Sequence, residues 1–325
     1  MSVQPEPLTE RILGGLPGPR AFRIVAWAAV PWLNAGANLL LEDEARSAVW
    51  EQSDVFVVLN YALLSLAVVI ALVGAERIAR RLHSLLTTSS VLAGDPHTSF
   101  REMNSTTGPL VASAAAGLAF GLTALVQDGP AAAFLRGATW FVLGIALFTY
   151  LWTYGSLLLG LDRLGRRQLR DEAALIDPGL GLQPFGRLAF TGLWMLLVWL
   201  VPLVLTGLPD VVGVVIGLLV LTAALTTFFL SLYRLHRQMV AVKARELELA
   251  RSLYAKAYAP VRTEATVEAL DRQHHLLHAA DGLERRAREI HDWPIDEGIV
   301  ARVITIATSV AAITVARLIL DPIGL

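Results

Sequence analysis

The sequence predicts an all-α, polytopic membrane protein with about seven transmembrane helices and a long cytoplasmic helical hairpin between the last two. Of its 325 residues 55% are hydrophobic and 17% are charged, whereas soluble domains carry about 25% charged residues. The apolar residues gather in blocks of roughly twenty, the length at which a helix crosses the hydrocarbon core. The loops between the blocks alternate between Arg-rich and Arg-poor. No alternating pattern of strands about ten residues long appears, which argues against a β-barrel.

Seven apolar blocks have approximately the length of a membrane span. They cover residues 21–41, 55–75, 109–127, 138–161, 186–207, 211–232 and 299–320. Because lipid offers no water to the backbone, each block is expected to form a helix. The first block is the weakest, since Arg23, Pro31, Asn34 and Asn38 interrupt it.

The blocks divide the chain into four regions. We expect a cytoplasmic N-terminal segment over 1–20 and a six-helix transmembrane region over 21–232. A cytoplasmic helical arm over 233–298 follows, and the chain ends in a final transmembrane helix over 299–325.

The charges of the loops predict the orientation of the chain, because cytoplasmic loops are enriched in Arg and Lys. Arg11 and Arg20 precede the first block, and the first loop is acidic. Every second connection after that is again rich in Arg. This alternation predicts a cytoplasmic N-terminus and a C-terminus outside. Lysine occurs only at Lys243 and Lys256, and this preference for Arg favours the inner membrane of a prokaryote as the location.

The long sixth loop has the pattern of a helical hairpin. The first helix is expected to run from the membrane to about residue 259, where Pro260 interrupts it, and a second helix is expected from about Thr263. Steps of three and four residues predict where the two helices meet. The expected seam on the second helix is Ala269, Gln273, Leu276, Ala280, Leu283, Ala287 and Ile290, and on the first it is Leu235, Met239, Val242, Leu249 and Leu253.

Arginine clusters mark the ends of two membrane blocks. They can bind the headgroups of anionic lipids, or they can serve only to set the topology. The headgroup candidates are Arg77, Arg80, Arg81, Arg163, Arg166, Arg167 and Arg170.

Three asparagines are candidates for polar groups at membrane depth. Asn34 and Asn38 are four residues apart and share a helix face, and Asn60 belongs to the second block. Such side chains either form hydrogen bonds between helices or line a path. Two spacings of the GxxxG type, at Gly117 with Gly121 and at Gly213 with Gly217, indicate close helix packing.

Several classes of function lack their usual residues. Within the apolar blocks the ionisable residues Arg23, Arg302 and Arg317 lie near span ends, so neither proton coupling nor an intramembrane enzyme is expected. The chain has no cysteine, and no P-loop, HExxH or GxSxG pattern appears. The histidines His274, His275 and His278 are expected on a solvated helix face, because the predicted seam leaves them on the outside. The alternative is that they bind a metal ion. We therefore expect no enzyme, no cofactor and no bound metal.

The last block carries a narrow face of small and polar residues. Steps of three and four residues place Arg302, Thr305, Ser309, Ala312 and Ala316 on it. Such a face allows close packing of helices, or it lines a water-filled path. Both interpretations remain open.

Two hypotheses about function follow. The first is a passive ion channel or pore-like transport protein, a homo-oligomer in the lipid bilayer whose last helix lines a path for ions. Its predicted topology resembles the architecture of insect chemoreceptor-type channels, with no shared motif. The second is a non-transporting scaffold or sensor whose arm binds a cytoplasmic protein. The net charge of −1 argues against a nucleic-acid partner.

Overall fold

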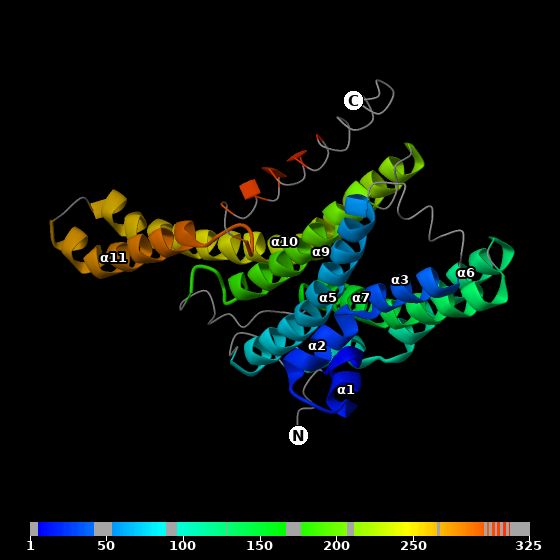
Figure 1. Cartoon of the computed structure of the whole chain (residues 1–325). Helices are drawn as coiled ribbons and strands as arrows, with labels where there is room; N and C mark the ends of the chain where they lie inside the picture. Colours follow the sequence, from blue (N-terminus) through cyan, green and yellow to red (C-terminus); the bar gives the residue numbers. More distant parts are fainter. Residues whose placement is uncertain are drawn as a thin grey trace.

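The structure, a computed structural model, consists of helices joined by turns (Figure 1). It describes residues 6–41, 54–88, 96–127, 129–166, 177–206, 211–264 and 267–295, together with 298, 301–302, 304–305, 308–309 and 312. Within these residues no strand occurs. The predicted all-α class is therefore confirmed for the part of the chain that the structure describes.

Ten helical elements are described. They are α1 (Leu8–Gly15), α2 (Arg20–Ala28), α3 (Val30–Leu41), α5 (Asp54–Thr88), the 3-10 helix η1 (Pro96–Asn104), α6 (Thr107–Gln127), α7 (Pro130–Leu164), α9 (Gln183–Thr206), α10 (Val211–Glu264) and α11 (Val267–Glu289).

Four segments of these helices are long and apolar enough to cross a membrane. They are Tyr61–Thr88, Thr98–Gln127, Pro130–Leu164 and Leu219–Ala259. Four of the predicted blocks overlap them. A fifth block, 186–207, coincides closely with α9, which has 24 residues. The last block lies mostly outside the described residues, so the number of seven spans stays a prediction.

The first predicted block is divided into two short helices. The expectation of one continuous helix over 21–41 is wrong, because α2 ends at Ala28 and α3 begins at Val30; that the two helices cross the membrane together stays a prediction. Pro31 explains the division, since it has no N–H to donate and fits only the first turn of a helix. With 9 and 12 residues, each helix is shorter than the bilayer core of about 30 Å. Helix α2 packs on α5, and α3 packs on α7 and α5.

The main core lies between α5, α7, α9 and α10, and it is apolar. Inside a membrane such a core is held by close packing and not by exclusion of water. Tyr150 of α7 donates a hydrogen bond of 2.6 Å to the carbonyl of Gly192 on α9. Residues of the core with exposure of 2% or less include Ile78, Leu82, Leu157, Leu161, Leu188, Leu193, Phe228 and Leu232.

Helices α6 and α7 form a close pair because glycines meet at their crossing. A Cβ atom on Gly117 would lie 2.8 Å from the carbonyl oxygen of Gly137, and one on Gly121 would lie 3.2 Å from that of Ala133. The prediction of close packing at this GxxxG spacing is confirmed. The side chains around Gly213 and Gly217 lie outside the described residues.

The Arg-rich ends of several helices meet at one end of the bundle. Arg163 at the end of α7 contacts Glu102 of η1 at 2.6 Å. Arg234 of α10 reaches Asp162 of α7 at 3.1 Å. Arg20 of α2 contacts Glu76 of α5. The connections that the sequence marks as basic are thus gathered on one side of the bundle, as a common membrane face requires.

The long helix α10 and α11 lie side by side over much of the length of α11 (Figure 1). Helix α10 continues through Pro260 to Glu264, and α11 begins at Val267, so the predicted boundaries at residues 259 and 263 are wrong. A proline so close to a helix end removes one hydrogen bond without stopping the last turn.

The contact between α10 and α11 is formed by alanines. Ala250, Ala257, Ala280 and Ala287 have exposures of at most 1%. The prediction that Leu249 and Leu276 belong to the seam is wrong, since their side chains are 48% and 41% exposed. On α10 the buried positions Met239, Ala250 and Ala257 are eleven and then seven residues apart, so the seam lies one residue later than the predicted position Leu249. A straight helix drifts by about 20° per heptad from a strict 3.5-residue repeat, which moves the buried stripe to later residues.

The other seam predictions have mixed outcomes. Leu235, Met239 and Ile290 are buried, as expected. Val242, Leu253 and Leu283 are partly buried. The side chains of Ala269 and Gln273 lie outside the described residues.

Candidate functional site

The predicted polar face of the last helix is exposed in the single chain. Among its residues, Arg302, Thr305, Ser309 and Ala312 are described, and all four are helical and exposed. Ala316 lies outside the described residues. The face is therefore free to contact lipid, water or a second copy of the chain.

The hydroxyl groups of this helix are satisfied by its own backbone. Thr305 Oγ1 donates to the carbonyl of Ala301 at 2.9 Å, and Ser309 Oγ donates to that of Thr305 at 2.8 Å. Thr308, on a neighbouring face, does the same to Ile304. Such bonds to the preceding turn remove the need for another polar partner. The hydroxyl groups thus tolerate lipid as well as water.

A cavity separates the start of the last helix from α9. Its volume is about 510 Å³, and it is lined by Phe190, Trp194, Ala301, Arg302 and Thr305. Two of the predicted face residues, Arg302 and Thr305, thus border open volume next to two aromatic side chains. The cavity is the part of the predicted face that the structure brings together with another element.

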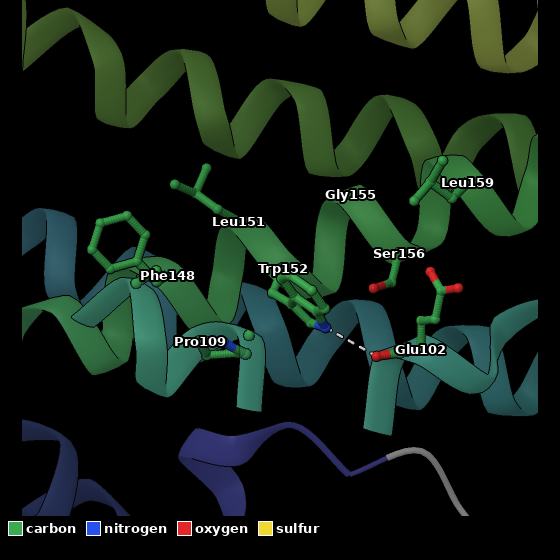
Figure 2. Close-up of a pocket in the computed structure, with 10 residues that line it drawn as sticks. Glu102, Pro109, Phe148, Leu151, Trp152, Gly155, Ser156 and Leu159 are labelled. Atoms are coloured by element: carbon green, nitrogen blue, oxygen red, sulfur yellow. Dashed lines mark hydrogen bonds between the residues drawn. The ribbon is translucent and has the colours of Figure 1, made fainter. Parts of the chain in front are cut away.

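A second cavity, which the sequence analysis missed, lies between η1, α6 and α7 (Figure 2). It has a volume of about 310 Å³. Trp152 donates its indole N–H to the carbonyl of Glu102 at 3.0 Å, while the Glu102 carboxylate accepts from Arg163 at 2.6 Å. In Figure 2 the Ser156 hydroxyl lies near the Glu102 carboxylate at one end, and Phe148 and Leu151 lie at the other. The cavity is therefore amphipathic.

Glycines in and beside this second cavity allow close contact with aromatic side chains, and they are the signal that the sequence offers for this part of the fold. A Cβ atom on Gly108 would lie 2.4 Å from the Trp152 ring, and one on Gly160 would lie 2.1 Å from Phe100. These glycines let two aromatic side chains lie directly against the backbone of the facing helix. A glycine in an apolar helix does not reveal which aromatic residue lies opposite it. From the sequence alone these glycines therefore could not locate the cavity.

The headgroup candidates differ in how they are engaged. Arg77 and Arg81 are exposed, and Arg80 pairs with Glu76 at 3.2 Å with 63% of its side chain exposed. Arg163 is held by Glu102, and Arg166 pairs with Asp162 at 3.0 Å. Arg167 and Arg170 lie outside the described residues.

A buried carboxylate that the sequence analysis missed connects the N-terminal helices to the bundle. Glu76 of α5 is 8% exposed, and it contacts Arg20 of α2 and Arg80. Arg20 also binds Glu10 of α1 at 3.0 Å. Burial raises the pKa of the Glu10 carboxyl group, although the charge of Arg20 opposes this shift. Glu76 stands one residue before an arginine cluster, which made it appear to be an ordinary exposed charge.

Among the predicted intramembrane asparagines, Asn34 forms a contact between helices. Its side-chain oxygen accepts a hydrogen bond of 3.2 Å from Thr139 of α7. This agrees with interhelical hydrogen bonding, one of the two interpretations open from the sequence. The side chains of Asn38 and Asn60 lie outside the described residues.

The elbow, which we define as residues 290–295 between α11 and the last helix, is fixed to α9 and α10. His236 of α10 stacks on Trp293 with ring centres 4.2 Å apart, and Lys243 binds Asp292 at 2.8 Å. The N–H of His291 donates to the carbonyl of Pro178 at 3.1 Å. Pro294 and Ile295 are buried against Gly186, where an added Cβ atom would lie 2.0 Å from the Pro294 carbonyl oxygen.

The three histidines of α11 are exposed. The ring centres of His274 and His278 are 4.3 Å apart, and those of His274 and His275 are 6.1 Å apart. In the described part of the chain, no group of three or more His, Cys, Asp or Glu side chains has the geometry to hold a metal ion. Nearby Asp281 instead accepts a hydrogen bond from Tyr254 of α10.

These arrangements contain two cavities, one exposed polar helix face and one fixed elbow. Comparison of the chain with protein-family models, with curated proteins and with solved structures finds no match.

Proposed function

We propose that the chain is a passive ion channel or pore-like transport protein that works as a homo-oligomer, with the last helix lining the path. The observation that carries this proposal is the position of Arg302 and Thr305, which border a cavity of about 510 Å³ where a packing face would contact protein. Residues of a path must reach solvent or open volume in this way.

The dry core of the bundle supports a path outside it. The space between α5, α7, α9 and α10 is filled by leucine, alanine and aromatic side chains. Ions cross a membrane along polar or charged surfaces, and the polar groups of this cluster are the buried hydroxyl groups of Tyr150 and Tyr154. The exposed face of the last helix is therefore the candidate surface for the ion path. The last helices of neighbouring copies would surround this path on a symmetry axis.

The proposed topology has seven spans, a cytoplasmic N-terminus and arm, and a C-terminus outside the inner membrane of a prokaryote. The meeting of the basic helix ends at one side of the bundle supports this orientation. The cytoplasmic hairpin would consist of the distal part of α10 together with α11. The proposed partners are the lipid bilayer, further copies of the chain and ions, with no nucleic acid and no cofactor, and the chain is not an enzyme.

The second candidate is a scaffold or sensor whose arm binds a cytoplasmic protein. The hydroxyl bonds of Thr305 and Ser309 to their own helix favour it, because a face satisfied in this way needs no water. The experiment below therefore separates the two functions.

The test is conductance of the purified protein in planar bilayers. The parent is expected to conduct. Arg302→Glu is expected to shift the reversal potential in a salt gradient towards cations, because a charged ring at a mouth sets selectivity. Thr305→Leu and Ser309→Leu are expected to lower the conductance. Thr308→Leu is the matched control, because Thr308 has the same backbone bond on a different face.

Two results would contradict the channel. One is a folded, oligomeric parent that never conducts. The other is a set of folded variants at Arg302, Thr305 and Ser309 that conduct like the parent and like Thr308→Leu. Either result leaves the polar face as a contact surface and favours the scaffold.

A further inference from the structure

We propose that the cavity between α9 and the last helix binds an anionic phospholipid, with its phosphate on Arg302 and an acyl chain against Phe190 and Trp194. The site shares Arg302 with the proposed path, but the lipid would lie on the side of the last helix that faces α9, and its test does not depend on ion conduction. It differs from the arginine clusters at the ends of α5 and α7. It consists of a cation and an aromatic wall that border the same open volume.

The dimensions and chemistry of the cavity suit part of a lipid. Its volume of about 510 Å³ lies within the range of roughly 300–1,000 Å³ that is typical of ligand sites. Phe190 and Trp194 provide apolar surface for a hydrocarbon chain. Trp194 is 44% exposed, so the aromatic wall continues to the outer surface of the helix, where lipid is present in any membrane.

Arg302 gives the site its preference for a negative charge. In the part of the chain that the structure describes, its guanidinium group forms no ion pair. A guanidinium group binds phosphate through two parallel hydrogen bonds. Arg302 follows Ile295 of the elbow by seven residues, so it lies near the start of the last helix and can reach a headgroup by extending its side chain.

A second cation strengthens the same face. Arg187, Phe190 and Trp194 follow one another on α9 by three and four residues and therefore share one side of that helix. Arg187 is exposed. A lipid in the cavity would meet Arg302 from one helix and the field of Arg187 from the other. Free phosphate would gain the charges but not the aromatic wall, which is why a lipid is the better ligand.

Quenching of tryptophan fluorescence by brominated lipids tests the site. The full chain is reconstituted in vesicles of phosphatidylcholine and phosphatidylglycerol, with the brominated acyl chains on one lipid or the other at equal fractions. The chain has eight tryptophans, so the signal of Trp194 is obtained by subtracting the Trp194→Phe variant. Quenching of Trp194 is expected to be several-fold stronger when phosphatidylglycerol carries the bromine.

Arg302→Gln is expected to remove this preference, while Arg302→Lys keeps most of it and shows that the position tolerates substitution. Arg77→Gln, at an exposed arginine of α5, is expected to leave it unchanged. Ala301→Trp fills the cavity and should reduce quenching by both lipids, measured after subtraction of the same variant with Trp194→Phe. Excess inorganic phosphate should not restore fluorescence.

Equal quenching by both lipids in the parent would overturn the proposal, as would a preference that persists in Arg302→Gln. Relief of the quenching by inorganic phosphate would assign the cation to a soluble anion instead. No current is measured, so a protein that does not conduct can still show the site, and a conducting protein can lack it.

Discussion

Gly186→Ala tests whether the elbow is fixed to α9 as tightly as the structure indicates. The new Cβ atom would lie 2.0 Å from the carbonyl oxygen of Pro294 and 2.7 Å from a methyl group of Ile295. Real Cβ atoms essentially never come within 3.0 Å of another atom. The elbow must therefore move by at least 1.0 Å, the difference between 3.0 and 2.0 Å, and the atom that blocks it belongs to the backbone.

Overpacking of this kind costs about 1–3 kcal/mol. The matched control is Gly282→Ala in α11, where an added Cβ atom meets nothing within 4 Å. There alanine gains helix propensity of about 1 kcal/mol. Gly186 lies in α9 and gains the same helix propensity, so the two variants should differ by the overpacking cost of about 1–3 kcal/mol in stability.

The assay is thermal unfolding of both variants in one detergent, with the parent alongside. Gly186→Ala is expected to unfold at a lower temperature than the parent, and Gly282→Ala at the same or a higher one. A Gly186→Ala variant as stable as the parent would mean that the contact between the elbow and α9 does not hold the two together.

Three further predictions concern the arm, the N-terminal helices and the topology. Ala280→Asp places a charge in the alanine seam and should cost several kcal/mol, whereas Leu276→Asp on the exposed side should leave the unfolding temperature nearly unchanged; equal effects would contradict the seam. Because the pKa of Glu10 is raised above 4.5, the folded state holds its proton more tightly, so the parent should lose stability relative to Glu10→Gln as the pH rises from 4.5 through the raised pKa; a constant difference would refute this. A membrane-impermeant thiol reagent should not label Ser252→Cys in intact cells, and labelling would reverse the proposed orientation.

Features with a strong local cause could be predicted from the sequence. The apolar blocks gave the helical class because twenty apolar residues have few other stable arrangements. The GxxxG spacing at Gly117 and Gly121 gave the close approach of α6 and α7, since only glycine permits that distance. The interruptions of the first block, Pro31 among them, were visible as well. They did not predict that the block divides into α2 and α3.

Features that depend on the phase of a helix or on a distant partner could not be predicted. The buried position in the arm is Ala250 and not Leu249, because a drift of about 20° per heptad changes which side chain faces α11 after a few turns. Glu76 became a buried ion pair through Arg20, 56 positions earlier in the chain. The cavity beside Arg302 depends on how two helices diverge, and residue periodicity carries no information about that.

Because α10 is one continuous helix, a small tilt at its membrane end moves the far end of the arm by a large distance. A helix of 54 residues is about 81 Å long, so a tilt of about 5° at its membrane end displaces its far end by about 7 Å. The elbow holds the chain after α11 against α10 through Asp292 and Trp293 and against α9 through Pro294. A tilt of the arm would therefore move the elbow, and with it the start of the last helix, by a much smaller distance than the tip of the arm.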